Sequence, residues 1–140
     1  MTLRYLLDTS IVSEPVAKKP SQAIVDRLMR LGSQCAIPAP VWHELQYGSE
    51  RLPEGKRRDV LQSYFAEVVA PSFEVLPYDD VAALRHAIER ARLERAGKTP
   101  PFVDGQIAAI ALTHNLVLVT RNVRDFSPFT GLKIENWGTR

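Results

Sequence analysis

The hydrophobic positions of this chain fall into short apolar runs that alternate with longer segments of helical spacing. Residues 3–7 and 116–119 are almost continuous apolar runs, which are typical of strands buried on both faces. Residues 22–31 and 79–96 repeat their apolar side chains every three to four positions, which predicts helices. The predicted strands are residues 3–7, 35–37, 73–76, 116–119 and 132–135, and the predicted helices are residues 22–31, 41–48, 59–69, 79–96 and 102–114.

The longest predicted helix, residues 79–96, begins with acidic residues, which favour a helix N-terminus because they complement the helix dipole. Its apolar side chains at Val81, Leu84, Ile88 and Ala91 lie on one face. We therefore expect this face to point toward the core.

Strands that alternate with helices are typical of a parallel sheet covered by helices on both sides. The predicted fold class is therefore α/β, a three-layer α/β/α arrangement with a short parallel sheet. The chain has 140 residues, of which 45% are hydrophobic, enough for one domain with its own core. No linker, repeat or low-complexity tract interrupts the pattern, so we expect residues 1–140 to form a single domain.

Charge and cysteine content exclude several classes of function. The 18 basic and 16 acidic residues give a net charge of +2, which is too small to indicate nucleic-acid binding by bulk charge. The single cysteine, Cys35, excludes an internal disulfide and a Cys-rich zinc site. The apolar run at residues 3–7 is too short for a signal peptide, and no stretch approaches membrane-spanning length. We expect a soluble cytoplasmic protein with no membrane partner.

Four acidic residues, Asp8, Glu44, Asp104 and Asp125, lie where an apolar run gives way to a helix start or a turn. In open parallel sheets, ligands bind beyond the carboxyl ends of the strands. Asp8 and Asp125 follow predicted strands, Glu44 lies a helical turn beyond another, and Asp104 reaches this edge if its helix start packs nearby. Each acid alone is equally well explained as a cap, dipole, surface or turn residue. Their coincidence at one edge favours a shared site.

Converging carboxylates repel one another, and a divalent cation removes that repulsion. Because thiolate ligands are lacking and the three histidines are dispersed, the expected ion is Mg²⁺ or Mn²⁺. Such ions bind phosphate oxygens and activate water, so the sequence predicts metal-assisted phosphodiester hydrolysis.

The acids lie in segments that resemble PIN-domain ribonucleases, and within them the VapC or FitB toxins of toxin–antitoxin pairs. The resemblance covers nearly the whole chain. It rests on Leu-Leu-Asp-Thr-Ser at residues 6–10, Glu-Leu at 44–45, Asp-Gly-Gln-Ile-Ala-Ala at 104–109 and Val-Thr-Arg-Asn-Val-Arg-Asp-Phe at 119–126.

This resemblance implies a Mg²⁺-dependent endoribonuclease with Asp8, Glu44 and Asp104 as its core acids. Relatives differ in whether the fourth group stands at the position of Asn122 or of Asp125. The groups expected to hydrogen-bond the ligands or to position water are Thr9, Ser10, Thr120 and Asn122.

The resemblance also implies a homodimer that cuts RNA and is inhibited by a small VapB-like antitoxin. At the rim of the predicted site, Arg121 and Arg124 are candidate contacts for RNA phosphates. Two alternatives remain open. One is a catalytically inactive domain that binds RNA or protein, and the other is a phosphatase that uses Asp8 as its nucleophile, although Ser10 stands where a second acid would be needed.

Overall fold

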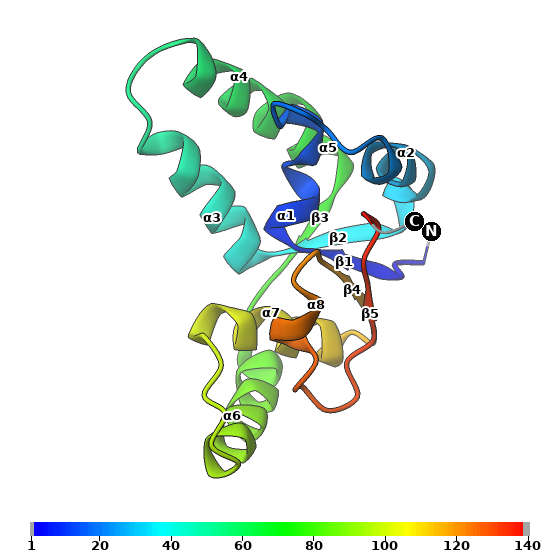
Figure 1. The fold of residues 1–140 in the computed structure, drawn as a ribbon, viewed down its shortest axis with the longest axis vertical. Helices are drawn as coiled ribbons and strands as arrows, with labels where there is room; N and C mark the ends of the chain where they lie inside the picture. Colours follow the sequence, from blue (N-terminus) through cyan, green and yellow to red (C-terminus); the bar gives the residue numbers. More distant parts are fainter. Residues whose placement is uncertain (1, 139–140) are drawn as a thin grey trace.

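The computed structural model describes residues 2–138, and at its centre lies a sheet of five parallel strands (Figure 1). Their order across the sheet is β3-β2-β1-β4-β5, so the first strand of the chain lies in the middle. The predicted α/β class and all of the predicted strands are confirmed. The strands are β1 (Tyr5–Leu7), β2 (Cys35–Pro38), β3 (Glu74–Leu76), β4 (Val117–Val119) and β5 (Ile134–Glu135).

The parallel pairing of β1 with β2 and β4 fixes where the chain leaves the sheet. Leu7 lies beside Val119 in register, and the backbone N–H of Asp8 donates to the carbonyl of Val119 at 3.0 Å. Tyr5 lies beside Cys35 on the other side of β1. Because parallel strands end at the same edge, the residues that follow β1, β2 and β4 come together there.

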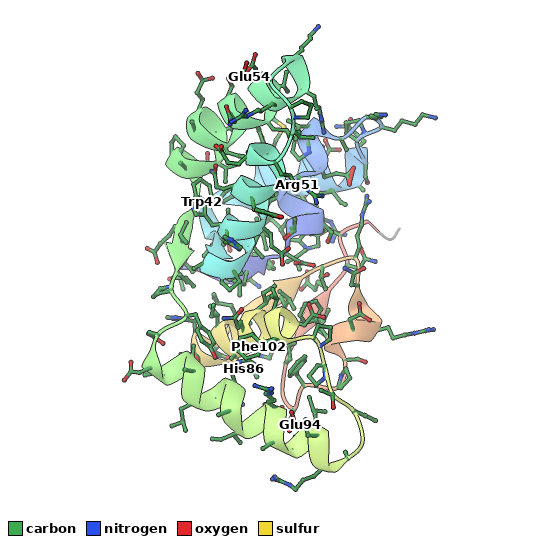
Figure 2. The ribbon with its side chains drawn as sticks, turned by 90° about the vertical axis from the view of Figure 1, so that its left-hand side faces the viewer. Trp42, Arg51, Glu54, His86, Glu94 and Phe102 are labelled. Carbon is green, nitrogen blue, oxygen red and sulfur yellow. The ribbon has the colours of Figure 1, made fainter. Side chains whose placement is uncertain are left out.

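Helices cover both faces of the sheet (Figure 1), and Figure 2 shows α3 and α6 toward opposite ends of the molecule. Above the sheet in Figure 1 lie α1 (Thr9–Val12), α2 (Gln22–Leu31), α3 (Ala39–Glu50), α4 (Lys56–Tyr64) and α5 (Ala70–Ser72), with short helical turns η1 (Glu14–Val16), η2 (Gly32–Gln34) and η3 (Phe65–Val69). Below it lie α6 (Asp80–Arg95), α7 (Phe102–Thr113) and α8 (Val123–Phe126). Within residues 2–138, no helix combines the length and the apolar character needed to cross a membrane.

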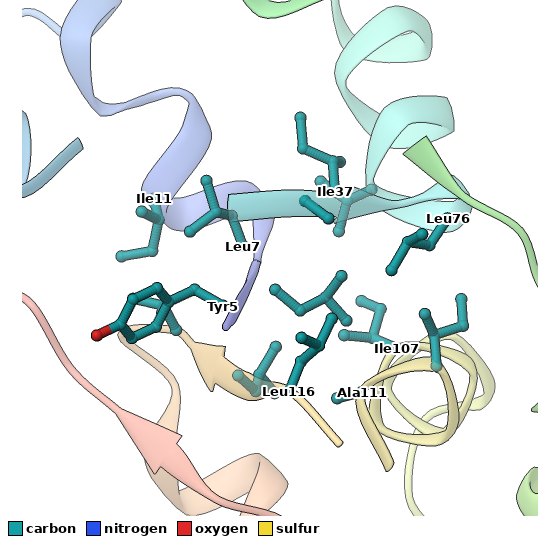
Figure 3. Close-up of a cluster of buried hydrophobic side chains, with 14 of the residues drawn as sticks. Tyr5, Leu7, Ile11, Ile37, Leu76, Ile107, Ala111 and Leu116 are labelled. Carbon is teal, nitrogen blue, oxygen red and sulfur yellow. The ribbon is translucent and has the colours of Figure 1, made fainter. Parts of the chain in front are cut away.

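The core forms where strand side chains meet helix faces from both layers. In Figure 3, Leu7 of β1 and Ile11 of α1 lie in one cluster with Ile37 of β2 and with Ile107 and Ala111 of α7. All of these side chains are buried. Burying an aliphatic side chain of this size stabilises the fold by about 1.5–3 kcal/mol. The packing holds α7 against the sheet.

The helix predicted at residues 59–69 is longer than expected and changes its winding. It begins at Lys56, runs as α4 to Tyr64, and then forms the π-helical turn η3 at Phe65–Val69. The first turn of α4 is entirely polar, so apolar periodicity gave no signal for it. Tyr64 anchors this helix, because its hydroxyl donates to the carbonyl of Val12 at 2.7 Å.

The prediction that Val81, Leu84, Ile88 and Ala91 of α6 face inward is wrong for the first three, and Ala91 is only partly buried. The exposed fractions of the first three are 56%, 64% and 55%. The buried face of α6 consists instead of Ala82, His86, Glu89 and Leu93.

Two of the buried side chains of α6 are polar, and specific partners satisfy them. Glu89 accepts hydrogen bonds from Arg92 and from the backbone N–H of Thr130. The hydrogen bonds from Arg92 hold the pKa of the Glu89 carboxyl below its ordinary value. Because the buried face of α6 includes Glu89 and His86, a search for apolar periodicity cannot recognise it.

His86 locks α6 against the start of α7. The Tyr78 hydroxyl and His86 Nδ1 share a hydrogen bond of 2.7 Å, and the rings of His86 and Phe102 meet edge to face with centroids 4.8 Å apart. Burial, and to a smaller extent the charge of Arg90, lowers the pKa of His86. Gly105 lies directly under the imidazole, and a Cβ at this position would overlap His86 Nε2.

Replacing Gly105 with alanine should therefore destabilise the fold by about 1–3 kcal/mol, because the new methyl group overpacks the contact between α6 and α7. Gly48→Ala is the matched control, since Gly48 also lies inside a helix but nothing lies within 4 Å of its added Cβ. That change should stabilise the fold by about 0.5–1 kcal/mol. Urea unfolding of both variants measures their free energies of unfolding. Equal changes of the same sign in the two variants would show that His86 does not lie tightly against position 105.

Candidate active site

Asp8 follows β1 directly and is held by three donors. Its side chain is 6% exposed. Oδ1 accepts a hydrogen bond from the backbone N–H of Thr9 at 2.8 Å, and Oδ2 accepts one from Thr120 Oγ1 at 2.7 Å. The hydroxyl of Ser10 donates to Oδ2 at 3.5 Å. Asp8 therefore caps α1, as its local sequence suggested, while remaining fixed at the carboxyl edge of the sheet.

Thr120 links Asp8 to the loop after β4. It is fully buried, and its hydroxyl donates a hydrogen bond to Asp8 Oδ2. The same hydroxyl oxygen accepts a hydrogen bond from the backbone N–H of Asn122 at 3.0 Å. The hydroxyl of Ser10 makes a second link, because it accepts the backbone N–H of Arg121 at 3.3 Å. The loops after β1 and β4 are thus joined through side-chain hydroxyls.

Glu44 reaches the same place from α3. This helix begins at Ala39 immediately after β2, and Pro40 fits its first turn because the amide there has no acceptor within the helix. Glu44 lies one helical turn further on. Its Oε2 accepts a hydrogen bond from Thr9 Oγ1 at 3.1 Å, which ties the exposed Glu44 to the residue after Asp8.

Asp104 lies in the first turn of α7 and is partly buried. Its pKa is raised to about 6, first by burial and then by the negative charges of Asp8, Asp125 and Glu44. A carboxyl group whose pKa is shifted by three other carboxylates lies within their electrostatic reach. The fourth acid, Asp125, is an exposed residue of α8.

A buried acid that sequence reasoning missed organises the loop before α8. Glu14 is 4% exposed, pairs with Arg121 at 2.8 Å between Oε1 and Nη2, and accepts the backbone N–H of Ser21 at 2.9 Å. The guanidinium of Arg121, predicted to contact RNA, is thus engaged within the protein. A lone glutamate in a polar loop carries no sequence signal for this role.

The carboxylates surround Asp104 without forming a closed cage. Among residues 2–138, no three His, Cys, Asp or Glu side chains are close enough to form a ready-made metal-binding group. The side-chain atoms of the four acids that could bind a metal are nevertheless all oxygens. Burial and the charges of the other three acids raise the pKa of Asp104. These properties fit a cation that retains several water ligands, as Mg²⁺ does.

Two hollows flank the acids. One of about 230 Å³ is lined by Asp125 and Arg124 of α8 together with Lys98 and Thr99 of the loop before α7. The other, of about 300 Å³, lies between α3 and α7 and includes Glu44. A larger, mostly apolar hollow of about 570 Å³ lies between α2 and the α4–η3 segment and contains none of the four acids.

Known proteins resemble this chain along most of its length. The family model described as PIN domain matches residues 5–129. Toxin FitB of Neisseria gonorrhoeae is 33% identical over 124 residues, which cover 86% of this chain and 89% of that protein. The tRNA(fMet)-specific endonuclease VapC of Shigella flexneri is 31% identical over 137 residues, covering 96% and 98% of the two chains.

A solved structure shows the same fold. The crystal structure of FitAcB from Neisseria gonorrhoeae matches with a TM-score of 0.87 and 31% identity, covering 95% of this chain and 97% of that one. The resemblance inferred from the acidic segments is therefore confirmed by sequence and by structure. Because the family model spans most of the sequence and these relatives align along nearly all of it, the chain belongs to the PIN-domain family.

Proposed function

We propose that this chain acts as a single-domain, divalent-metal-dependent endoribonuclease that hydrolyses RNA phosphodiester bonds. The observation that carries the proposal is the meeting of acids at the carboxyl edge of the sheet, where Asp8 follows β1 and is linked through Thr9 to Glu44 of α3. The raised pKa of Asp104, caused by burial and then by Asp8, Asp125 and Glu44, agrees with this placement. Acids that repel one another at the carboxyl edge of a parallel sheet favour a bound cation. The relative from Shigella flexneri, named as an endonuclease acting on tRNA, supports RNA as the substrate class.

The proposed ion is Mg²⁺, with Mn²⁺ as a substitute, because every available ligand is an oxygen. We assign Asp8, Glu44 and Asp104 as ligands, and Asp125 to the fourth position with Asn122 as its alternative. When bound, the ion lowers the pKa of a water molecule and neutralises charge on the phosphate.

The neighbouring hydroxyls position these acids. Thr120 and Ser10 donate to the same oxygen of Asp8, and Thr9 donates to Glu44. Asp8 Oδ1 and Glu44 Oε2 each accept one hydrogen bond and so keep a further lone pair for a ligand or water. Residues of this kind orient metal ligands and raise metal affinity.

The proposed partners follow from the toxin relatives. FitB is named a toxin, so we propose that this chain is the toxin of a VapBC-type pair. A small VapB-like antitoxin would then inhibit it, and its active form would be a homodimer. Because its proposed substrate is RNA, we assign its action to the cytoplasm, where cutting RNA would inhibit translation or growth.

Both alternatives account for fewer of these observations. A phosphatase that used Asp8 as nucleophile would need an acid at position 10, where Ser10 instead bonds Asp8 and Arg121. A domain that binds RNA or protein without catalysis would not require four mutually repelling acids. The phosphatase is therefore set aside, and the inactive domain is tested directly by the cleavage assay.

Asp104→Asn should abolish RNA cleavage while leaving the fold intact, because the substitution removes the charge but keeps the shape. The assay follows cutting of a single-stranded RNA in Mg²⁺ and in EDTA, with circular dichroism as the check on folding. EDTA should stop cleavage by the native chain. Asp26→Asn, which changes an exposed acid on α2, is the matched control and should cut normally. Normal cutting by Asp104→Asn, or by the native chain in EDTA, would refute the proposal.

The stability of the metal-free protein should depend on pH through Asp104. Its pKa is about 6 in the folded chain against an ordinary 3.8. The folded state thus binds this proton more tightly than the unfolded state, and the resulting stabilisation is present below pH 4 and is lost as the pH rises through 6. The loss is at most about 3 kcal/mol.

Melting temperatures measured from pH 4 to pH 7 in EDTA test this linkage. The native chain should lose stability relative to Asp104→Asn over that range, and added Mg²⁺ should restore it at pH 7. Parallel melting curves for the two proteins at every pH would contradict the assigned shift.

Arg124 and Lys98, which line the hollow beside Asp125, are the proposed phosphate-binding side chains. The double variant Arg124→Ala, Lys98→Ala should bind single-stranded RNA more weakly. The plot of the logarithm of its binding constant against the logarithm of the salt concentration should also be less steep, by about 0.7 for each phosphate that is no longer neutralised. Arg30→Ala, an exposed cation in the last turn of α2, is the control. An unchanged slope in the double variant would exclude a phosphate-binding role for both side chains. Arg121 is not substituted, because removing it also breaks its ion pair with Glu14.

A further inference from the structure

The hollow between α3 and α7 extends the acidic site in one direction. His43 and Glu44 of α3, Val103 and Gln106 of α7, and Tyr78 line it. Val103 precedes Asp104 and Gln106 follows it by two residues, so the hollow begins where two of the proposed metal ligands lie. Its lining combines ring faces and aliphatic surface with an amide and an imidazole, both of which form hydrogen bonds.

A row of flat side chains continues outward from this hollow along α3. His43, Tyr47 and Arg51 follow one another at a spacing of four residues, which places them on one face of the helix. The rings of His43 and Tyr47 stack with centroids 6.1 Å apart and planes inclined by 21°. The guanidinium carbon of Arg51 lies 5.7 Å from the centre of the Tyr47 ring. We call these three residues the α3 stacking strip.

The strip is exposed along its whole length. The exposed fraction of Tyr47 is 58%, and His43 and Arg51 are also exposed. Figure 1 shows α3 and α4 extending together away from the sheet, and Arg51 caps the far end of α3. Figure 2 labels Arg51 in this part of the molecule. The strip therefore leads from Glu44 outward along a projecting arm.

Exposed, aligned rings and a guanidinium group suit one class of ligand well. Unpaired nucleobases stack on aromatic faces and on arginine planes, whichever base they carry. Arg51 adds a positive charge, which attracts the phosphate backbone. A peptide that docks by burying apolar side chains would find little matching surface in a row of an imidazole, a phenol and a guanidinium.

We propose that the α3 stacking strip and the adjoining hollow bind unpaired nucleobases of the RNA next to the bond that is cut. The proposal rests on the endoribonuclease function proposed above and adds to it a surface beside the cut that holds the bases. Tyr47 is the central contact, with a base against the part of its ring that His43 and Arg51 leave exposed. His43 and Gln106, which line the hollow, form hydrogen bonds with a base there.

The test compares two forms of one short single-stranded RNA, with all bases present or with abasic residues throughout one half. Binding is followed by fluorescence anisotropy in EDTA, which stops cleavage and so separates base binding from catalysis. The native chain should prefer the RNA that carries bases. Tyr47→Ala should weaken binding of that RNA by about 5- to 100-fold, and it should leave binding of the abasic RNA nearly unchanged.

Three matched variants make the result specific. Tyr47→Phe retains the ring and should bind like the native chain, and Met29→Ala, at an exposed apolar residue of α2, should also bind normally. Arg51→Ala should lower the salt slope, which Tyr47→Ala should leave unchanged because stacking involves no counterion release. Circular dichroism checks that α3 remains folded.

Several outcomes would overturn the proposal. Equally weakened binding of both RNAs by Tyr47→Ala would show that Tyr47 supports the fold of α3 rather than a base. Binding by Tyr47→Phe as weak as that by Tyr47→Ala would show that the hydroxyl, and not the ring, makes the contact. A native chain with no preference for bases would assign the strip to a protein contact instead. Failure of the endoribonuclease function shows separately, as absence of cutting by the native chain in Mg²⁺, whatever the preference measured in EDTA.

Discussion

The parallel register of β1 between β2 and β4 is the constraint on which the rest of the site depends. It sends the chain out of the sheet at the same edge after Leu7, after Pro38 and after Val119. Each exit leads into a helix or turn that carries an acid, and α7 brings a further acid to that edge by packing against the strands. Strands of three or four residues suffice, because the core side chains that hold them are almost completely buried.

Gathering acids in this way opposes folding, and the surrounding groups limit the penalty. Asp8 is the most buried of the four and has the most donors, from Thr9, Thr120 and Ser10. Asp104 is partly buried, and its burial and the charges of the other three acids raise its pKa. The charge that the protein leaves unbalanced is the charge that a divalent cation would balance.

The sequence predicted the sheet edge well because apolar runs followed by acids report directly on where strands end. This signal placed Asp8 and Glu44 at that edge, where the structure also has them, and the interpretation of Asp8 as a helix cap is confirmed. The signal failed where burial depends on partners far along the chain. Glu89 is buried because Arg92 and Thr130 satisfy it, and Glu14 is buried because it pairs with Arg121, and neither relation leaves a local pattern. For the same reason, the apolar residues of α6 were wrongly assigned to the core.

One helix, α3, connects the proposed chemistry to the proposed recognition of substrate. Glu44 and His43 are neighbours in sequence, so they project about 100° apart around the helix axis. Glu44 turns toward Thr9 and the acidic edge, while His43 begins the row that continues through Tyr47 and Arg51. Glu44 and the stacking strip are fixed to the same helix backbone. A base bound to the strip would therefore hold its attached phosphate at a fixed distance from the carboxylates. Positioning of this kind is what a metal-dependent hydrolysis requires, since the ion and the scissile phosphate must meet in one geometry.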